Sequence, residues 1–167
     1  TSIGVTDTNG FTHSDIYAGG VAGYATDALF VDVASTANIN VDLPDSTANV
    51  FTGVFVGEAN GLNIESISKL SSVRDHASLT VNTKGNNYAG AVAGKATNMY
   101  IKDLELDLSG LSIILRNNDS ENNVYGGILF GYIDNTSATA IEEAHVVANE
   151  PFRLEAYSDT YTGTTYT

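Results

Sequence analysis

Four segments of the chain share one pattern: Tyr17-Ala-Gly-Gly-Val-Ala-Gly23, Phe51-Thr-Gly-Val-Phe-Val-Gly57, Tyr88-Ala-Gly-Ala-Val-Ala-Gly94 and Tyr125-Gly-Gly-Ile-Leu-Phe-Gly131. Their starts are 34, 37 and 37 residues apart, and each reads aromatic-x-Gly-x-apolar-x-Gly. A segment that recurs at a nearly constant spacing indicates a repeat architecture. The period within each segment is two, and the β-branched and aromatic residues with interior glycines favour a strand over a helix.

Further strands are expected after each motif, for example at residues 29–33 and 39–43 in the first repeat and at 99–108 and 111–115 in the third. Three strands per repeat in a fixed order, without a crossover helix, predict an all-β fold: a parallel β-helix (β-solenoid) of about four three-stranded coils. Equivalent residues then stack, so that the four aromatic residues that begin the motifs form one column. A sandwich of antiparallel strands is the competing architecture.

We expect a single β-solenoid domain over residues 1–157, with repeats that start near 17, 51, 88 and 125. Residues 158–167 are rich in Tyr and Thr, so we expect a flexible C-terminal tail or linker. A second hypothesis is that this tail docks on a neighbouring copy with Tyr166 as an aromatic anchor. The chain opens at Thr1 without a methionine, so we expect either a mature product or a module excised from a longer chain with neighbouring domains.

Charge narrows the choice of partners. The chain has 20 acidic and 7 basic residues, a formal net charge of -13, and no Cys. This charge repels phosphate, so we expect neither nucleic acid nor an anionic membrane as a partner. No run approaches the ~20 apolar residues of a membrane-spanning helix, so membrane insertion is not expected. Acidic self-repulsion favours a hard cation such as calcium, and the composition is typical of secreted bacterial proteins.

The phrases Tyr17-Ala-Gly-Gly-Val-Ala-Gly-Tyr24 and Tyr88-Ala-Gly-Ala-Val-Ala-Gly-Lys95 resemble the GLUG-type repeats of bacterial surface adhesins. This resemblance covers residues from about 17 to 147 and implies a β-helical, cell-surface, ligand-contacting role. An acidic, Cys-free module of this size also resembles the calcium-dependent peptide-binding domains of RTX adhesins. That resemblance implies capture of short peptides, including C-terminal ones, on a host or neighbouring cell.

Two segments are candidate calcium sites. The first is the run of oxygen-bearing residues 117–123, in which we single out Asn117, Asp119, Glu121 and Asn123. The second is Asp7-Thr8-Asn9-Gly10 with Asp15 beyond it, where Asp7, Asn9 and Asp15 are the candidate ligands. For both segments the alternative is a solvated turn, because Asn, Asp and Ser side chains hydrogen-bond to nearby backbone.

A polar corner follows each motif, at Thr26-Asp27, Asn60-Gly61, Thr97-Asn98 and Asp134-Asn135. These corners are expected to stack, which makes Asp27, Asp134 and Asn135 candidate ligand-binding residues. The alternative is a turn that needs the backbone tolerance of Asn or Gly.

Nothing in the sequence predicts catalysis. The three His residues lack His-Glu-x-x-His spacing, and neither a Gly-x-Ser-x-Gly elbow nor a phosphate-binding loop is present. We therefore expect a non-enzymatic, calcium-supported adhesin module, secreted to the bacterial cell surface, that binds peptide or glycan on another cell. The alternatives are a structural β-solenoid spacer of a surface protein and a polysaccharide-active β-helix enzyme.

Overall fold

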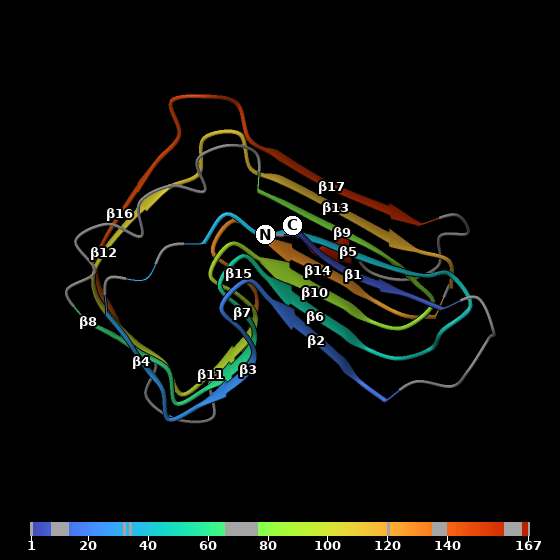
Figure 1. Ribbon diagram of the computed structural model, residues 1–167, viewed down its shortest axis with the longest axis horizontal. Helices are drawn as coiled ribbons and strands as arrows, with labels where there is room; N and C mark the ends of the chain where they lie inside the picture. The colour runs from blue at the N-terminus through green and yellow to red at the C-terminus, as the bar shows by residue number, and fades with distance from the viewer. Residues whose placement is uncertain are drawn as a thin grey trace.

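A computed structural model of the chain describes residues 2–7, 14–31, 33, 35–65, 77–119, 121–134, 140–158 and 165–166. Every regular element among these residues is a strand, and the strands are numbered β1 to β18 (Figure 1). They form four parallel sheets, and each sheet takes every fourth strand along the chain. Among the residues described, no helix has the length and apolar character needed to cross a membrane.

The two halves of each glycine motif lie in two different sheets. Sheet B contains β2 (Ile16–Gly19), β6 (Val50–Gly53), β10 (Asn87–Gly90), β14 (Val124–Gly127) and β18 (Thr165–Tyr166). Sheet C contains β3 (Ala22–Thr26), β7 (Val56–Asn60), β11 (Ala93–Thr97) and β15 (Phe130–Asp134). Each motif therefore crosses from sheet B to sheet C at its centre.

The remaining strands complete each coil. Sheet D contains β4 (Leu29–Phe30), β8 (Asn63–Glu65), β12 (Tyr100–Asp107) and β16 (Ala140–Val147). Sheet A contains β1 (Ser2–Thr6), β5 (Asn38–Leu43), β9 (Ser78–Thr83), β13 (Ser112–Asn117) and β17 (Arg153–Ser158). The chain thus runs through sheets B, C, D and A in turn four times, which confirms the predicted parallel β-solenoid of about four coils.

The number of strands per coil differs from the prediction, because the motif expected to be one strand is two strands with a bend between them. A Cβ on Gly90 would lie 2.5 Å from the carbonyl oxygen of Ala93, so a side chain at this position would block the bend. A Cβ on Gly94 would lie 2.6 Å from the carbonyl oxygen of Tyr88, because sheet C approaches the backbone of sheet B closely. Gly90 is therefore needed at the bend, and Gly94 is needed where the two strands approach each other closely.

One part of the core lies between sheets A and B, which pack face to face on the right of Figure 1. Along β5 the residues alternate strictly, so that Ile39, Val41 and Leu43 are buried and the residues between them are exposed. Burial removes apolar surface from water at roughly 25 cal/mol per Å². The same alternation recurs in β9 and β13, so each buried side chain stacks on its counterpart one coil away.

The polar corners that follow sheet C are left-handed turns. Asp27, Gly61 and Asn98 have φ values of 48°, 73° and 52°, a region that favours Gly and Asn over other residues. The turn interpretation of these three corners is therefore confirmed, and the fourth corner includes Asn135, which lies outside the described residues.

The C-terminal tail differs from the expected linker at two points. Ser158 is the last residue of β17, and Thr165–Tyr166 form β18. Strand β18 pairs in parallel with β14 of the same chain, with Tyr166 in register with Tyr125. The backbone at Tyr166 therefore occupies the next position above the aromatic residue of the fourth motif.

Candidate ligand-binding surface

The four aromatic residues that begin the motifs form the predicted column. The ring centroids of Tyr17 and Phe51 are 5.1 Å apart, those of Phe51 and Tyr88 are 4.7 Å apart, and those of Tyr88 and Tyr125 are 4.7 Å apart. Each pair is stacked, with interplanar angles of 9°, 9° and 4°. The parallel register of sheet B sets this spacing, because each ring is anchored one strand from the next.

The column stands on the outer face of sheet B. The next residue after Tyr125 is Gly126, where a Cβ would point at the side chains of Leu154 and Leu115 in sheet A. Since successive residues of a strand point to opposite faces, Tyr125 points away from sheet A. Stacked aromatic pairs of this kind add about 0.5–1.5 kcal/mol each beyond the area they bury.

A second column from sheet C runs beside the first. It consists of Tyr24, Glu58, Lys95 and Tyr132, which are in register on β3, β7, β11 and β15. Tyr24 packs edge-on against Tyr17 at 5.5 Å and 75°, and Tyr132 packs edge-on against Tyr125 at 5.4 Å and 66°. The bend at the glycines brings the two columns together.

An ion pair lies in the middle of the second column. Lys95 Nζ is 3.0 Å from Glu58 Oε1 and 5.7 Å from the centroid of the Phe51 ring. Burial acts to lower the pKa of Lys95, but the hydrogen bond to Glu58 and its charge outweigh burial and raise that pKa above 10.5. The ammonium group therefore keeps its charge beside the Phe51 ring.

We call these two columns together the aromatic ridge: Tyr17, Phe51, Tyr88, Tyr125, Tyr24, Glu58, Lys95 and Tyr132. Its middle is covered, since Phe51 is only 5% exposed, whereas its ends are open. Tyr17 and Tyr132 are each 39% exposed and Tyr24 is 50% exposed. The ridge thus presents tyrosine rings to solvent on both sides of a central ion pair.

A chain of hydrogen bonds that links Asp15, Asn49, Asn86 and Asn123, which we call the amide ladder, borders the ridge. Asn49 Nδ2 donates to Asp15 Oδ1 at 2.9 Å, Asn86 Nδ2 donates to Asn49 Oδ1 at 2.8 Å, and the backbone N–H of Asn123 donates to Asn86 Oδ1 at 2.8 Å. All four residues precede their motif's aromatic residue by two positions, so they share its face of the strand. The ladder holds adjacent coils in register next to the aromatic column.

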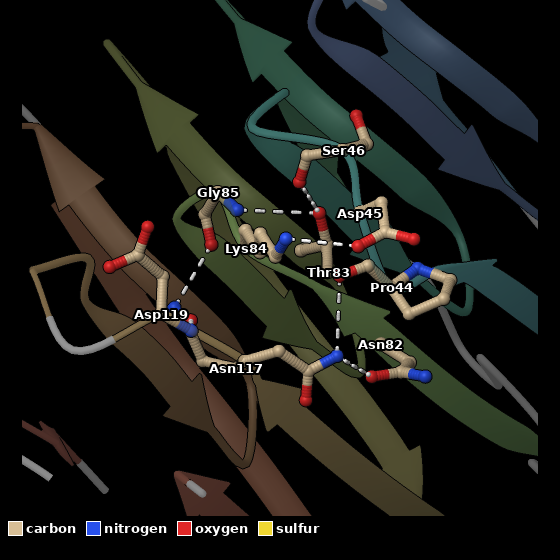
Figure 2. A network of polar contacts seen from close by, with 10 residues as sticks. Pro44, Asp45, Ser46, Asn82, Thr83, Lys84, Gly85, Asn117 and Asp119 are labelled. Atoms are coloured by element: carbon tan, nitrogen blue, oxygen red, sulfur yellow. Dashed lines mark hydrogen bonds and ion pairs between the residues drawn. The ribbon is translucent and has the colours of Figure 1, made fainter. Parts of the chain in front are cut away.

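In the candidate calcium segment 117–123, of which the structure describes all residues but Ser120, the side chains of Asn117 and Asp119 make hydrogen bonds to the backbone, and Figure 2 shows where these two residues lie. Asn117 is buried, and its Nδ2 donates to the carbonyl oxygen of Gly85 at 3.0 Å while its Oδ1 accepts the N–H of Asp119 at 2.7 Å. Oδ1 of Asp119 accepts the N–H of Glu121 at 2.9 Å. Both polar atoms of the Asn117 side chain are therefore used in hydrogen bonds within the protein. Asp119 and Glu121 lie nearer the surface.

The same network ties this turn to the two coils before it. Thr83 Oγ1 donates to the carbonyl oxygen of Ser46 at 2.6 Å, and Asn118 Nδ2 donates to Asn82 Oδ1 at 2.8 Å. Lys84 Nζ lies 2.9 Å from Asp45 Oδ1 in an exposed ion pair. Figure 2 shows these contacts reaching from one connection between sheets A and B to the next.

The second candidate calcium segment is only partly described. Asp7 directly follows β1, Asn9 lies outside the described residues, and Asp15 belongs to the amide ladder. Over the ranges that the structure covers, no group of three or more His, Asp or Glu side chains is placed to hold a metal ion. Calcium binding at either segment, which can also use amide and backbone oxygens, stays a prediction.

The three candidate corner residues are Asp27, Asp134 and Asn135, and the first two have different surroundings. Asp27 adopts the left-handed conformation, and its Oδ1 lies against the position where a Cβ of Gly61 would be. Asp134 ends β15. Burial lowers the pKa of Lys95, and the charge of Asp134 raises it, as the hydrogen bond and charge of Glu58 do more strongly. Asn135 lies outside the described residues, so ligand contact at these corners stays a prediction.

Sequence reasoning missed the second column of the ridge and the amide ladder. Both carry a regular signal: the second column lies seven residues after each motif's aromatic residue, and the ladder lies two residues before it. In a straight strand an offset of seven places the second column on the opposite face. The bend at the glycines instead brings the second column next to the first.

No protein-family model matches this sequence, and no significant match was found among curated proteins or among solved structures.

Proposed function

We propose that this chain is a ligand-binding module of a secreted bacterial surface adhesin, and that the aromatic ridge contacts a peptide or glycan on another cell. In this proposal the chain has no catalytic role, its partners include neither nucleic acid nor a membrane interior, and it works beside neighbouring domains of a longer protein.

The observation that carries the proposal is the aromatic ridge. Tyr24 and Tyr132 are exposed large aromatic residues, and they flank a charge pair in which Lys95 is held over Phe51. Tyrosine rings combined with fixed charges are over-represented where proteins bind partners, because each ring supplies apolar area and a polar hydroxyl at a small cost in conformational entropy. The ridge also crosses the coils from the first to the fourth, so it suits an extended ligand.

The experiment is a peptide and glycan array probed with the chain in calcium. The double variant Tyr24→Ser/Tyr132→Ser removes the two exposed rings that lie edge-on to the column. Tyr157→Ser is the matched control, because Tyr157 is an exposed tyrosine of β17 in sheet A, outside the ridge. We expect the double variant to lose array signals that the control retains, and an unchanged pattern would refute the ridge as the binding surface.

We also propose that calcium supports the module. The net charge of -13 opposes a compact state, and a cation bound to the folded chain reduces this self-repulsion. A ligand that binds only the folded state stabilises it by about 2.7 kcal/mol at one hundred times its Kd. We expect the melting temperature to be higher in millimolar calcium than in chelator, and the gain to shrink in Asp119→Asn/Glu121→Gln. Equal melting temperatures in calcium and chelator would remove calcium from the proposal.

A structural spacer is the second candidate, and the packing of the ridge favours it. The inner residues of the ridge cover one another, and the amide ladder beside them joins adjacent coils. If stacking is the whole purpose of the ridge, Tyr24→Ser/Tyr132→Ser lowers the free energy of unfolding and the array stays blank for both proteins.

A further inference from the structure

Tyrosine is the side chain through which a one-electron oxidant reaches this chain. The sequence has no Cys and no Trp, and its one Met, Met99, is 0% exposed. Cys and exposed Met are otherwise among the side chains that oxidants attack readily. In the ridge, Tyr88 and Tyr125 are half-buried and Tyr132 is 39% exposed. Oxidation is therefore expected at tyrosine.

Two of these tyrosines are held face to face inside sheet B. Tyr88 and Tyr125 are in register on β10 and β14, with ring centroids 4.7 Å apart and ring planes at 4°. Both strands have a hydrogen-bonded neighbour on each side in the sheet. The backbone register therefore fixes the contact between the two rings.

The face-to-face orientation is the one that coupling of two tyrosyl radicals needs. In such a radical the unpaired electron occupies an orbital perpendicular to the ring, with density on the carbons next to the one that bears oxygen. Parallel rings direct these orbitals at each other, so the reacting carbons start in a near-attack arrangement. Tyr132 is also close, at 5.4 Å from Tyr125 and 6.0 Å from Tyr88, but it lies edge-on at 66° and 69°.

The other stacked pairs of the column lack a second phenol. Phe51 stacks on Tyr88 at 4.7 Å and on Tyr17 at 5.1 Å, so it separates these two tyrosines. A phenylalanine ring has no hydroxyl proton to lose and forms no phenoxyl radical. Of the three stacked pairs in the column, Tyr88–Tyr125 is the one in which both members are tyrosines.

We propose that Tyr88 and Tyr125 form an oxidative cross-linking site, which yields dityrosine between the third and fourth coils. One-electron oxidants take one electron from each phenol, and each phenol releases its hydroxyl proton to water. The two radicals form one C–C bond between the carbons next to the oxygen-bearing ones, and the hydrogens on those carbons then move to the oxygens. The protein thus loses two hydrogen atoms, as two protons and two electrons.

The bond joins residues that are 37 positions apart in the sequence. A cross-link between distant residues restricts the unfolded chain, so we expect the linked protein to melt at a higher temperature than the unlinked protein.

The test oxidises the full chain at low concentration with photo-excited tris(bipyridyl)ruthenium(II) and persulfate, a one-electron oxidant small enough to reach half-buried rings. The monomeric fraction is digested and mapped by mass spectrometry. We expect a monomer lighter by two hydrogen atoms, with dityrosine fluorescence and one linked pair of peptides that carries Tyr88 and Tyr125. Links between different chains alone, or a link within the chain that lacks either residue, overturn the inference.

Variants that keep an aromatic ring in place make the assignment independent of folding. We expect Tyr88→Phe and Tyr125→Phe each to lower the yield of the linked monomer at least about 10-fold, because each leaves one phenol without its stacked partner. Tyr157→Phe, outside the ridge, is the matched control and retains the link. Tyr132→Phe also retains it, and an equal loss there would assign the link to the edge-on ring and overturn the inference. These outcomes do not depend on which ligand, if any, the ridge binds.

Discussion

Tyr88 shows how the column changes the chemistry of a single residue. Its ring lies between Phe51 and Tyr125, and the edge of Tyr132 faces it at a centroid distance of 6.0 Å. Burial, and then the neighbouring tyrosines Tyr125 and Tyr132, raise the pKa of Tyr88 from 10.0 to about 12. The stacked environment therefore favours the neutral phenol over the phenolate.

This shift makes the stability of the fold depend on pH in the alkaline range. A tyrosine whose pKa is raised on folding contributes fully below pH 10.0 and loses its contribution as the pH rises towards about 12. We expect Tyr88→Phe, which keeps the ring and has no proton to lose, to leave stability at pH 7 nearly unchanged and to flatten the decline above pH 10.0. Urea unfolding at a series of pH values measures this, and parallel declines for the two proteins would contradict it.

At the scale of the element, the junction between sheets B and C decides how the motif is used. The strand bends at its first glycine and passes close to the preceding strand at its second glycine, as Gly90 and Gly94 show. The bend turns residues that follow the motif towards the aromatic residue that begins it. The second column of the ridge therefore exists because glycine allows this bend.

Alanine substitution tests the close approach. A Cβ at position 94 would lie 2.6 Å from both the carbonyl oxygen of Tyr88 and the amide nitrogen of Thr52, so we expect Gly94→Ala to destabilise the fold. Overpacking of this kind costs about 1–3 kcal/mol or more. Gly4→Ala is the control, since nothing lies within 4 Å of a Cβ there. Chemical unfolding compares the two, and similar free energies would show that the backbone contact is not restrictive.

At the scale of the whole molecule, a solenoid has a middle and two ends with unequal burial. Among the described residues, the large apolar side chains that are exposed come from the first and last coils, such as Val21 and Leu29 at one end and Ile133 and Ile141 at the other. Each repeat contacts only its neighbours, so a terminal coil is covered on one side only. The open ends are where other coils or partners would add apolar contacts.

A matched pair of substitutions measures this difference between the end and the middle. Val21 and Val92 occupy the same position of the motif, but Val21 is 44% exposed and Val92 is 0% exposed. We expect Val92→Ala to cost about 1–3 kcal/mol, because it removes buried methyl groups and leaves a cavity. For Val21→Ala we expect about 0.5 kcal/mol or less. Thermal unfolding followed by circular dichroism measures both, and equal losses would mean that the first coil is packed as fully as the third.

Much of the architecture could be predicted from the sequence alone. The repeat spacing, the period of two and the recurring aromatic residue led to parallel coils and to the stacked column, and both are confirmed. These features are predictable because stacking places identical positions above one another, so each local preference is repeated in every coil. The left-handed corners at Asp27 and Asn98 were predictable for the same reason.

The site depended on the tertiary structure. Whether Glu58 and Lys95 face the aromatic column follows from the bend between sheets B and C. A sequence records the order of residues along a strand, but the angle between two strands is set by how closely their backbones can pack. By itself the sequence determined the coil and its stacked columns, and only the folded chain decided which columns meet at the surface.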